Sequence, residues 1–269
     1  MPNKIIIDCP DRMIAAIRRY GVIPFFKGTL PGFSIEELTA PGCWFTDSEE
    51  FGGTLGPWDW KIDCVREGDI AYGKFLGGKA AFATVEYYRH LMNWRRSLAR
   101  YRMALGEPFK ARTKSESMMQ TLSPIALCAI REAGALEAGE LRRICEAKAP
   151  QLAMRKSIMD SVIQFLQMGT WSVIGDFRRM YRGPDLSYNG WQRASNTTPD
   201  ELFAASCSSS EKMEDIPLWA RRFQEEVLKE EEGDSLNVAC SPSQSREFLI
   251  AHLEKLHSGA SRSILERII

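Results

Sequence analysis

Several features that would assign a chain of 269 residues to a specialised class are missing here. No apolar run approaches the roughly 18 residues that a membrane-spanning helix needs. Residues 1–11 contain Asp8 and Asp11, and their apolar stretch is too short for a secretory signal. The 7 cysteines form no C-x-x-C pair and lie far in sequence from the 3 histidines, so neither zinc nor disulfides are indicated. We therefore expect a cytoplasmic protein with no membrane, metal or cofactor partner.

The chain also has no excess of positive or negative charge, because its formal net charge is zero. The charges are nevertheless strongly segregated along the chain. Residues 86–114 carry eight basic and two acidic side chains, whereas 34–70 carry two and nine, and 196–240 carry four and eleven. Such asymmetry is a better guide to partners than the total charge. The basic block favours a nucleic-acid partner, and the acidic blocks allow a basic protein partner.

Residues 122–203 contain the most informative pattern. The serine and proline at 123–124 are typical of a helix start, and Gly134 suits its left-handed C-terminal cap. Apolar residues at helical spacing predict a second helix over 137–147 and a third over 154–168. The third helix also has a polar face, which points away from its apolar side and consists of Arg155, Asp160, Gln164 and Gln167. Three helices in this order predict a helix-turn-helix whose third helix enters the DNA major groove.

A basic hairpin is predicted directly after the third helix. Residues 171–177 alternate between apolar and polar as in a half-buried strand, and turn signals follow at 183–185 and 188–190. Three arginines precede the first turn. This hairpin would be the wing of a winged helix, with its arginines placed to contact phosphates.

A second basic element is expected from Val85 to Arg102, begun by Thr84 as N-cap. One side carries aromatic and leucine side chains at steps of three and four, and the other carries Arg89, Asn93, Arg96 and Arg100. The polar stripe either tracks a phosphate backbone or is only a solvated face. The candidate DNA-binding residues of the whole chain are Arg89, Arg96, Arg100, Arg155, Lys156, Gln164, Gln167, Arg178, Arg179 and Arg182.

The predicted fold is α+β and mostly helical, with winged helix-turn-helix modules and β-hairpin wings. Helix caps are expected at Ser34, Thr198 and Ser241, and a two-residue hairpin turn at Gly77-Gly78. An aromatic loop is expected over 42–61, a serine-rich joint over 206–210, and helices over 218–232, 243–257 and 260–268. The expected domains are a degenerate N-terminal module (1–106), a linker (107–121), the winged helix (122–203) and a C-terminal helical extension (204–269).

Three segments together resemble a known family. They are 79–88, which leads into the Arg-rich helix, 129–134 in the first helix of the predicted winged helix, and 165–169 before the basic wing. Their order resembles the tandem winged-helix family of AlkZ-type DNA glycosylases, and most closely its shorter AlkZ-related members. The resemblance implies double-stranded DNA as partner. AlkZ-type enzymes unhook interstrand crosslinks and excise alkylated purines.

One departure from that family affects the expected activity. The glycosylases place a polar pair, Gln-x-Gln or Gln-x-Asp, shortly after the first helix to orient the attacking water. Here Pro24 and Phe26 would occupy those positions, and neither ring can hold or polarise water. A family histidine is also missing, with Gly78 nearest. The resemblance therefore implies the fold and the DNA surface without the catalysis.

Three functions remain open at this stage. The first is a non-catalytic DNA-binding protein. The second is an active glycosylase whose water-orienting acid has moved to Asp59 or Asp63, beside Trp58 and Trp60, although a solvated acidic loop explains these carboxylates as well. The third is a protein-interaction module, since winged helices also serve as docking folds.

Overall fold

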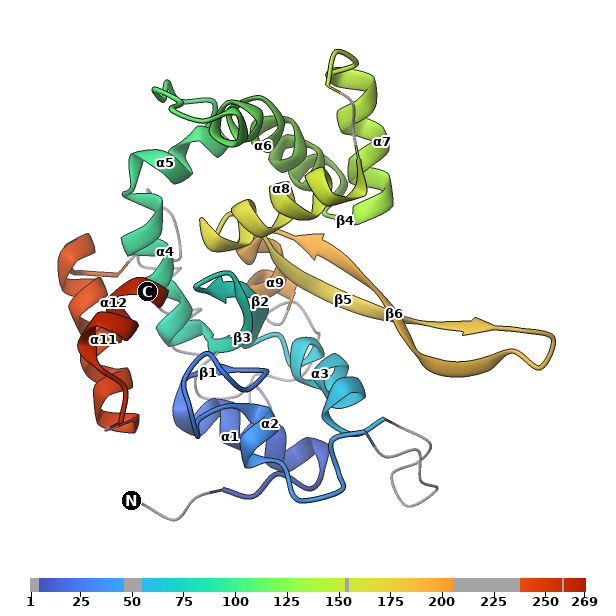
Figure 1. The fold of residues 1–269 in the computed structure, drawn as a ribbon, viewed down its shortest axis with the longest axis vertical. Helices are drawn as coiled ribbons and strands as arrows, with labels where there is room; N and C mark the ends of the chain where they lie inside the picture. Colours follow the sequence, from blue (N-terminus) through green and yellow to red (C-terminus); the bar gives the residue numbers. More distant parts are fainter. Residues whose placement is uncertain (1–4, 46–54, 153–154, 206–237, 258) are drawn as a thin grey trace.

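The computed structural model describes residues 5–45, 55–152, 155–205, 238–257 and 259–269. It is an α+β fold, mostly helical, with two small antiparallel sheets (Figure 1). This confirms the α+β, mostly helical part of the predicted fold class. The helix expected over 218–232 and the joint over 206–210 lie outside the described residues.

The N-terminal half surrounds a sheet of three short strands. Ser34 accepts a hydrogen bond from the backbone N–H of Glu37, as the predicted cap requires. The predicted turn at Gly77-Gly78 is confirmed, and both glycines have positive φ (55° and 75°). The expected aromatic loop ends early, because Pro57 begins a helix. The elements are α1 (Pro10–Tyr20), β1 (Val22–Pro24), α2 (Ile35–Leu38), α3 (Pro57–Arg66), β2 (Ile70–Leu76), β3 (Lys79–Thr84), α4 (Val85–Arg96) and α5 (Ala99–Arg102).

The second half adds the other sheet, in which the last strand lies between the other two (strand order β4-β6-β5). The caps expected at Thr198 and Ser241 are both present. The elements are α6 (Lys114–Ala133), β4 (Ala135–Glu137), α7 (Ala138–Lys148), α8 (Lys156–Met168), β5 (Val173–Arg182), β6 (Ser187–Thr197), α9 (Pro199–Ala205), α11 (Pro242–Leu256) and α12 (Arg262–Ile268).

Helix α6 begins earlier than expected. Its capping box is formed by Thr113 and Glu116, so the predicted start at Ser123 is wrong and the expected linker already contains its first turns. Pro124 lies inside the helix, where it cannot donate a backbone hydrogen bond. The buried hydroxyl of Ser123 donates to the carbonyl of Met119 (2.6 Å), so this residue does not act as an N-cap.

The expected long basic helix is divided in two. Helix α4 ends at Arg96, and Leu98 has an extended backbone (φ −80°, ψ 122°) before α5 begins. The buried face of α4 also differs from the prediction. It consists of Tyr88, Leu91, Met92 and Arg95, because the C-terminal helices cover the neighbouring side of α4.

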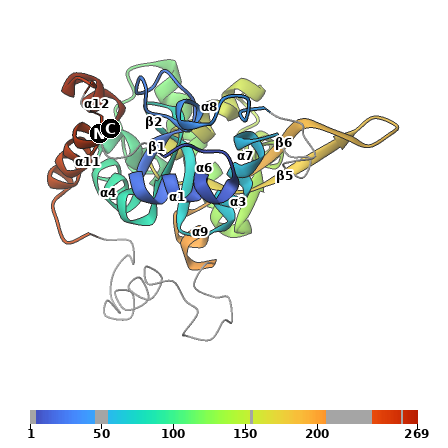
Figure 2. The same cartoon turned by 90° about the horizontal axis from the view of Figure 1, so that it is seen from below.

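Two apolar clusters hold the chain together. One combines the N-terminal elements with the base of the β5–β6 hairpin and with α11 and α12, and the other lies between α5, α6, α7 and α8. Figures 1 and 2 both show α11 and α12 beside α4. Within the described residues, none of the helices combines the length and apolar character that a bilayer crossing requires.

Candidate functional site

A groove of 590 Å³ lies between α7, α8, β2 and the β5–β6 hairpin. Its floor is mainly apolar, and includes Tyr72, Met159, Ile163, Ile174 and Phe177. Its charged lining includes five basic residues (Lys74, Arg142, Lys156, Arg182 and Arg193) and two acidic ones (Glu137 and Asp160). A cleft with an apolar floor and mostly basic charges suits an anionic ligand with flat apolar parts.

The polar face of α8 is only partly free to contact a ligand. Gln167 is 2% exposed, and its amide accepts from the backbone N–H of Lys74 (2.9 Å) and donates to Asn196 (3.1 Å). Gln164 donates to the carbonyl of Gly78 (3.3 Å). The prediction that Gln167 points away from the core is wrong, because the β2–β3 hairpin covers this end of α8. Helical spacing identified the polar face but not its partner.

The beginning of α8 remains accessible. Arg155, its N-cap residue, and Lys156, its first residue, are both exposed. Lys156 also lines the groove. A ligand can therefore reach α8 at its N-terminal end. Backbone N–H groups and the helix dipole also favour an anion there.

The arginine stripe expected on the basic helix does not form one exposed row. Asn93 donates to the carbonyl of Cys240 (2.9 Å) and to Ser245 (2.8 Å), because α11 packs there. Arg96 donates to the carbonyl of Thr170 (2.9 Å), and its guanidinium lies 4.5 Å from the centre of the Trp171 ring. Arg89 is half-buried and Arg100 is exposed. The prediction of one exposed stripe is therefore wrong, because Asn93 and Arg96 contact other parts of the chain.

The β5–β6 hairpin projects away from the rest of the chain (Figure 1). Near its base, Glu137 binds Arg178 (2.7 Å) and Arg193 (3.3 Å). Further out, the guanidinium of Arg182 lies 5.2 Å from the centre of the Trp191 ring, which is 57% exposed. The outer part of the hairpin thus presents a cation and an aromatic ring to the solvent.

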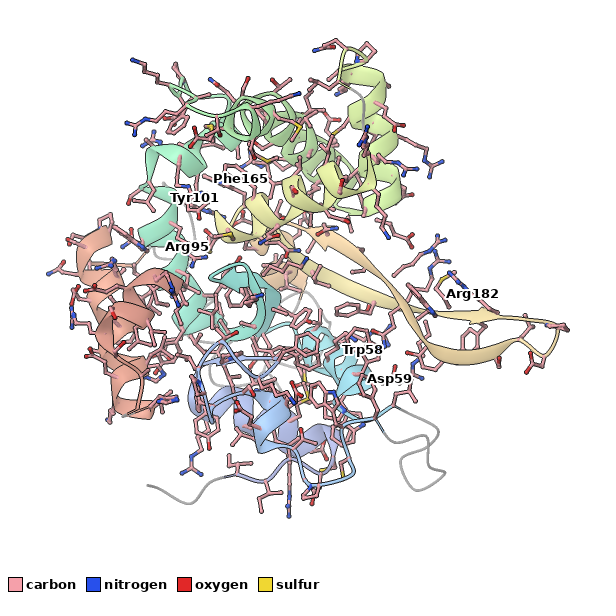
Figure 3. All side chains as sticks on the ribbon, in the orientation of Figure 1. Trp58, Asp59, Arg95, Tyr101, Phe165 and Arg182 are labelled. Carbon is pink, nitrogen blue, oxygen red and sulfur yellow. The ribbon has the colours of Figure 1, made fainter. Side chains whose placement is uncertain are left out.

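A buried carboxylate joins the hairpin to α3. Asp59 is 0% exposed and accepts hydrogen bonds from Tyr188 (2.6 Å), Gln192 (2.7 Å), Arg179 (3.2 Å) and the backbone N–H of Leu55 (2.6 Å). Figure 3 shows Asp59 and Trp58 on α3, and Arg182 farther along the hairpin. With four donors and no exposed surface, this carboxylate is placed to hold the hairpin.

The other acidic candidate differs in its surroundings. Asp63 is exposed, and partial burial raises the pKa of its carboxyl. The residues that line the groove come from elements other than α3, so Asp63 lies outside the groove. Asp59 and Asp63 therefore do not meet in one open site.

A buried lysine lies next to the Asp59 carboxylate. Lys61 is 1% exposed, and its ammonium group donates to the carbonyl of Trp58 and to the side-chain oxygen of Gln192 (2.5 Å). Its nitrogen lies 3.6 Å from the centre of the Trp58 ring and 4.8 Å from that of Phe177. Burial lowers the pKa of Lys61 to about 7; Asp59 opposes this effect, and a nearby arginine adds to it. Sequence reasoning missed Lys61, which is marked only by its position between two apolar residues.

The segment from Pro24 to Phe26, which was expected to lack catalytic groups, is apolar. Pro24 lies on β1, the outer strand of the first sheet, and pairs with Ala81 on the central strand β3. A missing backbone N–H is tolerated on an outer strand. Phe25 is fully buried and Phe26 is 40% exposed. The ring of Phe26 lies 6.4 Å from that of Trp58. No side chain at Pro24 or Phe26 can hold a water by hydrogen bonding.

The histidines have structural partners. His90 lies 3.0 Å from Ser245, His252 contacts the carbonyl of Tyr20 (2.7 Å), and His257 contacts the carbonyl of Pro31. In the part of the chain that the structure describes, no three histidine, cysteine or acidic side chains gather as a metal site would require.

Comparison with known proteins gives one match. A family model described as "AlkZ related" matches residues 7–269, which is nearly the whole chain. No significant match is found among curated proteins or among solved structures.

Proposed function

Because the chain belongs to the AlkZ-related family, we propose that it binds double-stranded DNA without excising bases. Two observations support the second part of this proposal. By the family resemblance, Pro24 and Phe26 would stand where the glycosylases carry their polar pair, and the ring of Phe26 packs against Trp44 and Trp58. Asp59, one of the two acids considered as a replacement, is occupied by four hydrogen-bond donors.

We further propose that residues 122–203, together with the start of α6, form a winged helix. The order α6–β4–α7–α8–β5–β6 and the sheet order β4-β6-β5 support this. The hairpin after α8 would be the wing. Because the C-terminal half of α8 is covered, DNA contact is proposed for Arg155 and Lys156 at its start and for Arg182 on the wing.

The single observation that carries the proposal is the charge of the groove. Five of the seven charged residues in its lining are basic, although the whole chain has no net charge. The start of α8 forms one side and the wing the other, so a phosphate backbone following the groove would meet both Lys156 and Arg182.

The test is duplex binding, measured by fluorescence anisotropy over a series of salt concentrations. We expect Lys156→Glu and Arg182→Glu each to weaken binding several-fold. Each should also reduce the slope of log K against log salt by about 1, because one phosphate contact releases about one counterion. The matched control is Lys255→Glu on α11, an exposed lysine that does not line the groove. It should leave both quantities unchanged.

Two results would favour the other functions. Absence of duplex binding by the unmodified protein at low salt would leave the protein-interaction module. The exposed Tyr181, Leu186 and Trp191 on the wing would then be its contact residues. Release of a methylated purine would favour an active glycosylase, and loss of that release in Asp63→Asn would identify its acid.

A further inference from the structure

We propose that Lys61 is a nucleophilic amine that forms a Schiff base with an aldehyde-bearing nucleic acid, such as an abasic site, held in the groove. This inference rests on the proposed DNA binding and adds a substrate class to it. It concerns DNA that has already lost a base, so it requires no excision by this chain.

The first argument is position. Gln192 lines the groove, and its side-chain oxygen accepts a hydrogen bond from the Lys61 nitrogen (2.5 Å). Phe177 lines the groove as well, with its ring 4.8 Å from the same nitrogen. The amine therefore lies directly behind the groove wall. Rotation of the one amide side chain of Gln192 would open a path from the groove to Lys61.

The second argument is the state of the amine. An ordinary surface lysine is almost fully protonated at neutral pH and has no lone pair for attack. Lys61 is buried between two aromatic rings, and Arg179 is a nearby second cation. Burial is the larger effect; together the two outweigh the opposing charge of Asp59, and the pKa of Lys61 is lowered to about 7. A large fraction is therefore neutral at physiological pH. A desolvated lysine beside another cation is a recognised form of activated nucleophile.

The third argument is that the surroundings can hold the substrate. Lys156 and Arg182 at the sides of the groove would bind the phosphates on either side of an abasic sugar. The apolar floor formed by Tyr72 and Phe177 can accept the sugar, which has no base attached. This arrangement favours a nucleic-acid aldehyde over a small neutral one.

The chemical step is balanced without any added cofactor. The Lys61 nitrogen attacks the C1′ aldehyde carbon of the open-chain sugar, and its lone pair forms the new C–N bond. The two protons of the amine pass to the carbonyl oxygen, which leaves as water, and the nitrogen and carbon are left joined as the imine. Asp59, which already accepts a hydrogen bond from Gln192, is close enough to stabilise the protonated imine as its counter-ion.

The experiment is reductive trapping. The full chain is incubated at pH 7.5 with a duplex that contains one abasic site, and sodium cyanoborohydride reduces any imine to a stable secondary amine. The covalent product is digested, and the modified lysine is identified by mass spectrometry. We expect a crosslink at Lys61 that is lost in Lys61→Met and increased in Gln192→Ala. It should be unchanged in Lys255→Met, whose lysine is exposed and outside the groove.

Duplex binding measured in the same samples separates the two proposals. If the duplex binds but no crosslink forms, or if the crosslink maps to Lys74 or Lys156, the Schiff-base inference is wrong and the DNA-binding function stands. If the duplex does not bind, both are overturned. Mapping on the unmodified protein keeps the test decisive even if Lys61→Met folds poorly.

Discussion

The hydroxyl of Tyr188 donates a 2.6 Å hydrogen bond to the carboxylate of Asp59, although 129 residues separate the two in sequence. Tyr188 lies on the hairpin and Asp59 on α3. Burial raises the pKa of the Tyr188 phenol to about 12, and its hydrogen bond to Asp59 adds to this effect. The phenol therefore remains a donor throughout the physiological pH range.

Loss of the Asp59 charge should loosen the hairpin. We expect Asp59→Asn to lower the free energy of unfolding by about 1 to 3 kcal/mol, because an amide replaces an oxygen that three side-chain donors share. Urea denaturation measures the effect. The matched control is Asp176→Asn, whose ion pair with Arg66 is exposed on both sides (50% and 58%) and should contribute less than about 1 kcal/mol. Equal effects of the two substitutions would refute the structural role of Asp59.

Lys61 should make stability depend on alkaline pH. Its folded pKa of about 7 lies below its ordinary value of 10.5, so the unfolded chain binds the proton more readily between these values. Stability should therefore fall as the pH is lowered from about 10 to about 7, and then level off. Over this window we expect the unfolding free energy of the unmodified protein to fall relative to that of Lys61→Met. A difference that is constant between pH 9.5 and pH 7 would contradict the lowered pKa.

Arg95 should be essential to the packing of the C-terminal helices. Its guanidinium is 3% exposed and donates to the carbonyls of Met168 (2.9 Å), Ile268 (2.9 Å) and Ile269 (3.0 Å). Arg95→Met has a similar length but leaves three carbonyls without this donor, so we expect a loss of about 3 kcal/mol in chemical denaturation. Arg112→Met, at an exposed position, is the control and should change stability by less than about 0.5 kcal/mol.

The chain should not release bases. Water-orienting groups contribute about a hundred- to ten-thousandfold to such reactions, and Pro24 and Phe26 cannot supply this contribution. In single-turnover assays with protein in excess, we expect a methylated purine to leave duplex DNA at the spontaneous rate. Release above that rate would disprove the non-catalytic function. Its loss in Asp59→Asn or Asp63→Asn would then show which acid orients the water.

Local signals predicted much of the fold. The caps at Ser34, Thr198 and Ser241 and the turn at Gly77-Gly78 were confirmed, because each depends only on residues within a few positions. The start of α6 was misjudged because Ser123 and Pro124 imitate a cap within a longer helix. A proline inside a helix removes a backbone hydrogen bond, so local rules favour a helix start at this position.

The candidate site was harder to predict, since it depends on contacts distant in sequence. Helical spacing shows which residues share a face but not what covers that face, so it predicts an exposed Gln167 where the structure has a buried one. In the same way, Asp59 was considered as a free acid because its donors Arg179 and Tyr188 lie at least 120 residues away. Lys61 acquires its properties only when the hairpin closes over it.

The packing of α11 against α4 also determines when the chain can fold during synthesis. His252 on α11 contacts the carbonyl of Tyr20, 232 residues earlier, and Arg95 on α4 contacts the carbonyl of Ile268, 173 residues later. Contacts at such separations form slowly, because a long loop must close before they contribute. As the chain leaves the ribosome, the side of α4 that α11 covers must remain exposed until α11 has been made. During this interval the N-terminal core is incomplete, and its apolar surface is the part of the nascent chain that a chaperone would bind.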